Sequence, residues 1–157
     1  METKIKSPSE CTDSEIDVFV RLTIEGGQVS PNNLTTKVKR AEKLVFIWEG
    51  GVCVAIAGLK NPADTYRNRV FAKAKVEDQK NDYKYEIGYI YSKIKGVGNE
   101  LMEAVLKASN SASLFATTKN TNNVMQYLLP KYGFERLGQS YLNDTEEYHL
   151  GLFGLKI

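Results

Sequence analysis

The chain has 157 residues, of which 42% are hydrophobic and 25% are charged, so we expect one domain with a substantial buried core. Its formal net charge of +2 is too small to indicate nucleic-acid binding. The two cysteines, Cys11 and Cys53, have neither CxxC nor Cys/His spacing, which argues against a metal site and against a disulfide framework.

The N-terminal half predicts a flexible start, two helices and a hairpin. Residues 1–12 are polar and lack the apolar region of a signal peptide. Since no run approaches membrane-spanning length, we expect a flexible first segment on a cytoplasmic protein without membrane association. Capping and apolar spacing predict helices over about 15–25 and 31–42. Residues 44–48 and 52–59 predict two strands joined by a tight turn at a pair of glycines.

A polar linker and a central strand follow the hairpin. Residues 60–69 include a proline and mostly polar side chains, so we predict a loop there. Residues 85–91 have the aromatic and branched composition of a strand. In a regular strand Ile87, Tyr89 and Tyr91 would share one face of the sheet.

The run Lys93-Ile94-Lys95-Gly96-Val97-Gly98 stands between this strand and a helix predicted over 99–108. A strand, a basic glycine loop and a helix N-terminus form a phosphate-binding arrangement, because backbone N–H groups and the helix dipole place positive charge there. Asn99 and Glu100 exclude a P-loop, and Leu101 excludes a dinucleotide fingerprint. Taken alone, these six residues also fit an ordinary strand-to-helix turn.

The C-terminal third predicts a strand, a short capped helix and two further strands. Residues 113–119 are apolar and β-prone, and the polar residues 120–123 supply helix caps. A helix is expected over 124–130, ending at Lys131-Tyr132-Gly133-Phe134-Glu135. Residues 147–153 predict the last strand.

This order of elements resembles the GNAT N-acetyltransferase superfamily. Lys93 to Gly98 is similar to its acyl-coenzyme A pyrophosphate loop, Arg/Gln-x-x-Gly-x-Gly/Ala, with lysine in the first position. The Gly133-Phe134 turn resembles the one that ends a helix in these proteins, and two helices before a hairpin match their front half. The resemblance implies an α/β (α+β) GNAT fold over residues 1–157: a mixed, mostly antiparallel sheet with splayed central strands and helices on both faces.

The resemblance also implies acetyl transfer from acetyl-coenzyme A (acetyl-CoA) to a primary amine, without a metal. Glu86 lies where many of these enzymes place a base, and a solvent-exposed strand-edge glutamate is the equal alternative. Leu129 occupies the usual position of the tyrosine that acts as the acid. Tyr132 is the candidate nearer that turn, with a core or rim role as its alternative, and Tyr91 and Tyr141 are further candidates, although water could protonate the thiolate. The implied contacts of coenzyme A are Tyr89, Ile90, Tyr91, Lys93, Ile94, Lys95, Gly96, Val97, Gly98, Asn99, Asn122 and Asn123. The implied contacts of the acceptor are Tyr66, Arg67, Arg69 and Tyr141.

Some of these assignments have alternatives. Asn122 and Asn123 are also expected to cap a helix, and the favoured alternative for Tyr66, Arg67 and Arg69 is a solvent-exposed loop with local salt bridges. Leu129 and the short approach at Ser92 favour a second function class, a GNAT-fold acyl-CoA-binding or protein-interaction module with little or no catalysis. We expect a small-molecule or peptide amine as acceptor and no nucleic-acid partner. Because dimers are common in the superfamily, a homodimer stays open.

Overall fold

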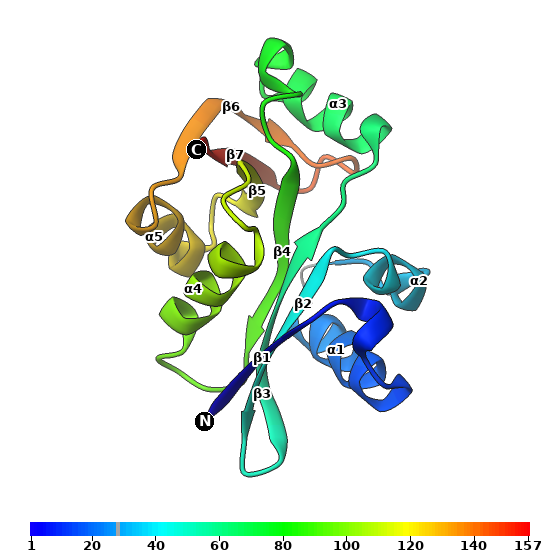
Figure 1. Cartoon of the computed structure of the whole chain (residues 1–157). Coiled ribbons are helices and arrows are strands. Elements are labelled where there is room, and N and C mark those ends of the chain that lie inside the picture. Colours follow the sequence, from blue (N-terminus) through cyan, green and yellow to red (C-terminus); the bar gives the residue numbers. More distant parts are fainter. Residues whose placement is uncertain (28) are drawn as a thin grey trace. The chain divides into compact units, whose positions relative to one another are not determined.

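The computed structural model describes residues 1–27 and 29–157, and these form two compact units (Figure 1). The first unit contains residues 1–61 and 87–110, and the second contains residues 62–86 and 111–157. Strand β4 (Tyr85–Ser92) contributes residues to both. The single domain predicted over residues 1–157 stays a prediction.

The first unit has a sheet of three antiparallel strands, extended by residues 87–92 of β4, with helices on both faces. Helices α1 and α2 cover one face and α4 covers the other (Figure 1). The strands are β1 (Glu2–Lys6), β2 (Lys43–Glu49) and β3 (Val52–Lys60), and the helices are α1 (Asp13–Gly26), α2 (Leu34–Lys39) and α4 (Gly98–Ala108), with a 3-10 turn, η1 (Pro8–Glu10).

Helix α1 forms for the reasons expected from its sequence. The Thr12 hydroxyl accepts a hydrogen bond from the Glu15 amide at 3.1 Å, and Gly27 ends the helix in the left-handed region, with φ of 68°. The apolar face buries Phe19, whose ring meets Phe46 of β2 edge-to-face with centroids 5.6 Å apart. The predicted helix and hairpin are therefore confirmed.

Two expectations for this unit are wrong. Within the segment expected to be flexible, β1 pairs with β2 from Glu2↔Trp48 to Lys6↔Leu44, and the Lys6 Nζ lies 2.8 Å from a Glu15 carboxylate oxygen. The edge of β2 and this ion pair fix a polar sequence that has little apolar signal of its own. The second helix is also shorter than predicted, because Arg40 caps α2 where the chain turns toward β2.

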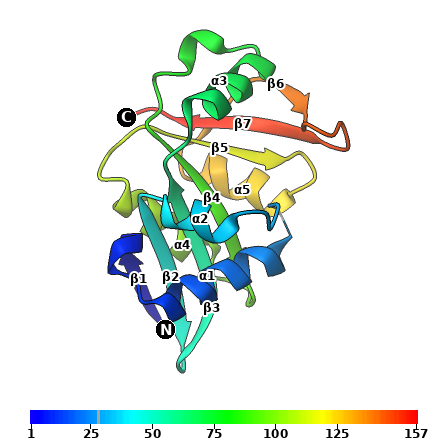
Figure 2. The same ribbon diagram turned by 90° about the vertical axis from the view of Figure 1, so that its right-hand side faces the viewer.

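The second unit has a mixed sheet with one helix on each face. Strands β5, β7 and β6 are antiparallel, and β4 joins β5 in parallel through two pairs, Tyr85↔Leu114 and Glu86↔Phe115. Helices α3 and α5 lie on opposite faces (Figure 2). The elements are α3 (Asp64–Lys73), a 3-10 turn η2 (Glu77–Gln79), β5 (Leu114–Lys119), α5 (Asn123–Lys131), β6 (Glu135–Leu142) and β7 (His149–Leu155).

The loop predicted over residues 60–69 is wrong, because most of it belongs to α3. Val70 and Phe71 are buried, and the Phe71 ring packs edge-to-face on Phe115 at 5.2 Å. Tyr66 lies one turn before Val70, on the same side of the helix. A narrow apolar stripe thus holds a helix whose other residues are polar, and composition alone hid it.

The strand order is β1-β2-β3-β4-β5-β7-β6, which makes the predicted mixed, mostly antiparallel sheet. Tyr89 and Tyr91 both pack against α1, so they share one face as predicted, but the backbone between them is not that of a regular strand. Tyr89 has a φ of 55°, which is rare for a bulky residue. A Cβ at Gly88 would lie 2.7 Å from the Lys60 side chain, and the Lys60 Nζ lies 4.6 Å from the centre of the Tyr89 ring. The backbone of β4 is therefore irregular at Tyr89.

Candidate functional site

A buried carboxylate forms the centre of the candidate site in the second unit. Glu86 lies in β4 with 3% of its surface exposed, and the Tyr66 hydroxyl of α3 donates a hydrogen bond to its Oε2 at 2.7 Å. The solvent-exposed strand-edge alternative for Glu86 is therefore wrong. A buried carboxylate is costly unless it is hydrogen-bonded, so Tyr66 makes this position tenable.

Tyr141 of β6 is the second phenol near Glu86. It is 8% exposed, and its hydroxyl has no hydrogen-bond partner among the described residues. Burial raises the pKa of Tyr141 far above its ordinary value, and the charge of Glu86 raises it further. Burial likewise raises the pKa of Tyr66, with the charge and hydrogen bond of Glu86 adding to it and a hydrogen bond with the Thr117 hydroxyl opposing it. Both phenols therefore keep their protons at neutral pH.

A bulge in β6 brings Tyr141 into this cluster. The register between β6 and β7 shifts between Leu137 and Tyr141, and Gly138 in this stretch has a φ of 61°. A Cβ on Gly138 would lie 1.9 Å from the Ala74 carbonyl oxygen, so only glycine allows the strand to pass α3 here. After the bulge Tyr141 pairs with Leu150 and packs among buried residues that include Phe71 and Phe115.

Charged residues surround the outer side of the cluster. The Arg69 guanidinium lies 5.7 Å from the centre of the Tyr66 ring, and its Nε lies 3.6 Å from an Asp144 carboxylate oxygen. Lys73, one turn further along α3, approaches the same oxygen at 2.8 Å. The pairing of Lys73 with Asp144 could not be predicted from the sequence, because it depends on α3, where a loop was expected.

The glycine loop of the first unit leads from β4 into α4. The Lys93 amide donates to the Val54 carbonyl at 2.8 Å, and the Ile94 amide donates to the Ser92 Oγ at 3.1 Å. The Ser92 hydroxyl also donates to the Ile94 carbonyl. Gly96 has a φ of 89° and is exposed, and a Cβ on it would meet no described atom within 4 Å, so its glycine serves the backbone turn. The short connection from Ser92 to Gly96 is thus a turn stabilised by hydrogen bonds.

Val97 and Gly98 begin helix α4 with its N–H groups toward the loop. Val97 is 2% exposed, and its carbonyl accepts the first helical hydrogen bond from Leu101 at 3.0 Å. The N–H groups before Leu101 have no carbonyl one turn earlier in the helix, so this end offers donors to an anion. Lys93 and Lys95 are exposed beside it, and the Lys93 Nζ lies 4.0 Å from Glu25.

Two of the other residues expected to contact coenzyme A pack against α1, and the rest lie in β4, α4 and at the start of α5. Tyr91 lies against Gly26 and its hydroxyl donates to Glu25 at 2.6 Å, while the Tyr89 ring packs on Phe19 at 5.8 Å. These side chains serve the packing of α1, so a contact with the donor would come from the backbone. Ile90 is half-buried in β4, Asn99 is exposed in the first turn of α4, and Asn123 is the first residue of α5. Asn122 caps α5 by accepting from the Met125 amide at 3.2 Å, as its alternative role predicts.

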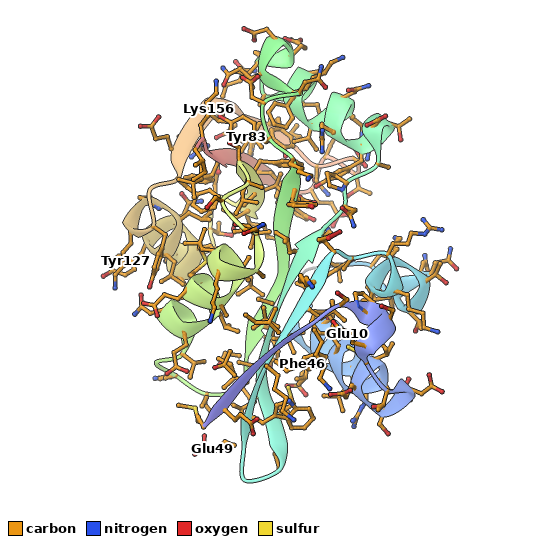
Figure 3. All side chains as sticks on the ribbon, viewed as in Figure 1. Glu10, Phe46, Glu49, Tyr83, Tyr127 and Lys156 are labelled. Atoms are coloured by element: carbon orange, nitrogen blue, oxygen red, sulfur yellow. The ribbon has the colours of Figure 1, made fainter. Side chains whose placement is uncertain are left out.

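The residues at the expected acid and acceptor positions mostly pack or hydrogen-bond within the fold. Leu129 is fully buried, and Tyr132 is half-buried at the C-cap of α5, with the Lys131 Nζ 6.0 Å from its ring centre. Arg67 donates to the Lys84 carbonyl at 2.9 Å and lies over Phe115. Tyr127 projects from α5 with 64% of its surface exposed (Figure 3). The phenols that adjoin Glu86 in this unit are instead Tyr66 and Tyr141.

Groups of side chains suited to a metal ion are absent from residues 1–27 and 29–157. Over the same residues, every helix is too short or too polar to cross a lipid bilayer.

No protein-family profile and no curated protein matches the sequence. Solved structures match it along nearly its whole length. An acyl-CoA N-acyltransferase from Pseudomonas aeruginosa is 16% identical, with a TM-score of 0.69 over 98% of this chain and 97% of that one. FeeM, an N-acyl amino acid synthase from uncultured soil microbes, is 14% identical, with a TM-score of 0.72 over 99% and 95%. Salmonella typhimurium yncA with its cofactor acetyl-CoA is 14% identical, with a TM-score of 0.62 over 98% and 93%. These likenesses confirm the predicted GNAT fold.

Proposed function

We propose that this chain is an N-acyltransferase that moves an acetyl group from acetyl-CoA to a primary amine. The observation that carries the proposal is the buried carboxylate of Glu86, which accepts a hydrogen bond from Tyr66 of α3. Glu86 lies on β4, the strand that leads into the basic glycine loop. The GNAT fold, and the acetyl-CoA bound by yncA, support this assignment of the donor. In this proposal the acceptor is a small-molecule or peptide amine and the protein is cytoplasmic.

The glycine loop fits the pyrophosphate of acetyl-CoA. The N-terminal N–H groups of α4 supply donors, and Lys93 and Lys95 supply positive charge beside them. Gly96 leaves the backbone open to close approach, since no described atom surrounds its Cβ position. Acetyl-CoA supplies the activated thioester, and the protein would hold it by this end.

Glu86 would act as the base for the amine. An ammonium must lose a proton before its nitrogen can form a bond with the acetyl carbon, and Glu86 would receive that proton directly or through one water. The nitrogen then bonds to the acetyl carbon, the adduct nitrogen loses its second proton to water, and the carbon–sulfur bond breaks so that the thiolate leaves. Tyr66 fixes the carboxylate, and the Tyr141 hydroxyl would make a hydrogen bond to the reacting amine or carbonyl.

A dedicated acid is unnecessary in this scheme. A free thiol has a pKa near ~8.5, well below that of a phenol. Because burial and Glu86 raise the pKa of Tyr141 further, proton transfer from Tyr141 to the thiolate would run uphill. Water can protonate the thiolate instead, so Leu129 at the usual tyrosine position does not disable the reaction.

Thiol release from acetyl-CoA across a panel of amines tests the proposal. We expect Glu86→Gln to lower kcat/KM by about 10²- to 10³-fold, the usual range for a general base, with acetyl-CoA affinity unchanged in calorimetry. Lys93→Glu combined with Lys95→Glu should instead abolish acetyl-CoA binding. The same exchange at Lys37 and Lys39, exposed on α2, is the matched control and should leave binding intact. Acetyl-CoA binding without turnover of any amine would favour the module of low catalysis and contradict the enzyme.

A further inference from the structure

Helix α3 presents one row of side chains toward the outer side of the Glu86 cluster. Tyr66, Arg69 and Lys73 follow each other at spacings of three and four residues, which places them on one face. The Tyr66 hydroxyl donates a hydrogen bond to Glu86, and the Arg69 guanidinium lies 5.7 Å from the centre of the Tyr66 ring. The side chain of Arg69 is 49% exposed, so it lies where the buried cluster meets solvent.

The charges around Arg69 do not balance within this group. Asp144 forms a close ion pair with Lys73 at 2.8 Å, whereas its oxygen lies 3.6 Å from the Arg69 Nε, beyond hydrogen-bond distance. The pKa of Asp144 is lowered first by the hydrogen bond from Lys73 and only then by the charge of Arg69. Asp144 is therefore the one carboxylate paired with both Arg69 and Lys73, and its closer contact is with Lys73. The Arg69 Nε lies too far from Asp144 for a hydrogen bond, so this carboxylate does not occupy the planar fork of Arg69.

The field of Arg69 also reaches the buried part of the site. Its charge lowers the pKa of Tyr141, against the larger effects of burial and of Glu86. The Tyr141 hydroxyl is a second polar group that the fold does not satisfy, since it is 8% exposed and has no hydrogen-bond partner among the described residues. A polar atom in this state is suited to a ligand that brings its own donor or acceptor.

These features together specify the polarity of the acceptor. A buried carboxylate inside favours an ammonium, and two cations outside oppose a molecule that carries only positive charge. Arginine binds carboxylates through two parallel hydrogen bonds, a geometry that its open fork allows. We propose that the acceptor is an amine that carries a carboxylate, as amino acids do, and that Arg69 binds the carboxylate while Glu86 receives the amine. This inference rests on the proposed acetyltransferase function.

The test compares amines in pairs that differ by one carboxylate. Suitable pairs are L-phenylalanine with phenethylamine and 4-aminobutyrate with propylamine, each assayed by thiol release from acetyl-CoA. We expect the wild-type protein to prefer the carboxylate-bearing member of at least one pair. Arg69→Met should lower kcat/KM for that member by about 10- to 100-fold, the range of one charge-assisted contact, and leave the partner amine unchanged. Arg21→Met, at an exposed arginine of α1, should change neither.

A second variant separates recognition from general damage to the fold. Asp144→Asn removes the carboxylate that competes for Arg69, so the KM of the carboxylate-bearing amine should not rise. The KM of the simple amine should rise, because Arg69 and Lys73 then repel its positive charge without Asp144 to offset them. Equal kcat/KM within both pairs, or equal losses for both members in Arg69→Met, would overturn the inference and leave the proposed function standing. Bound acetyl-CoA without turnover of any amine would instead overturn the proposed function, and the inference with it.

Discussion

The hydrogen bond from Tyr66 to Glu86 makes the most direct prediction about the site. Tyr66→Phe removes one hydroxyl and keeps the ring that packs beneath Arg69. The change takes a 2.7 Å donor away from a carboxylate that is only 3% exposed. Water cannot replace the donor freely at such a position, so the loss should appear in the free energy of unfolding.

The magnitude follows from the kind of bond that is lost. Hydrogen bonds to charged groups contribute about 1.5–3 kcal/mol, so Tyr66→Phe should lower the free energy of unfolding by roughly 2 kcal/mol. In the Glu86→Gln background the partner is neutral, and the same change should cost about 0.5–1.5 kcal/mol. The double-mutant cycle should therefore yield a coupling free energy of about 1 kcal/mol between the two side chains.

Urea unfolding of the four proteins measures this coupling, and Tyr127→Phe is the control. Tyr127 is 64% exposed, so loss of its hydroxyl should leave the free energy of unfolding within about 0.5 kcal/mol. In the amine assay Tyr66→Phe should lower kcat more than it raises the KM for the amine, since it disturbs the base. A coupling free energy near zero, with an unfolding cost no larger than that of the control, would refute the assigned role of Tyr66.

Two further predictions concern the fold around this site. Gly138→Ala should lower the free energy of unfolding by about 3–5 kcal/mol in urea, because the left-handed backbone and the overlap with Ala74 add together, whereas Gly50→Ala, with a φ of 56° and open space, should cost only about 1–2 kcal/mol. Similar costs for both would contradict the close approach. Tyr66 and Tyr141 have pKa values raised above the unfolded value near ~10, so their contribution to stability is complete below about pH 10 and is lost as the pH rises beyond it. In an ultraviolet titration at about pH 11, Tyr66→Phe with Tyr141→Phe should therefore show the wild-type tyrosinate amplitude while folded; a smaller amplitude would refute the shifts.

The sequence predicted those parts of the fold whose local signals agree with their packing. The hairpin at residues 44–59, the strand before Lys93 and the capped helix after Asn122 combine apolar runs with turn and cap residues. Strand β1 and helix α3 lack that agreement. Their sequences are polar, and they form because β2 offers an edge and because Phe71 finds Phe115, partners that lie far away in the chain.

The candidate site shows the same limit. Glu86, Tyr66 and Tyr141 were each named from the sequence, but the hydrogen bond that joins the first two requires α3 to be a helix. The bulge at Gly138 that brings in Tyr141 depends on the backbone of Ala74 passing beside it. The positive φ of Tyr89 likewise has no signal in the sequence, and the ring contacts this residue makes with Lys60 and Phe19 involve residues far away in the chain. The chemistry of single residues could be predicted from the sequence, and the geometry between residues could not.

Helix α3 connects catalysis with the choice of acceptor in the proposed scheme. Tyr66 holds the base, and Arg69, less than one turn later, would bind the acceptor's carboxylate. The loop from Lys93 to Gly98, which we propose binds the donor, belongs to the other unit. Substitutions along the exposed face of α3 should therefore alter which amine is used without altering acetyl-CoA binding. Because α3 also carries Tyr66, a substitution that alters the choice of acceptor by shifting the backbone of α3 would also weaken the hydrogen bond to Glu86, the proposed base.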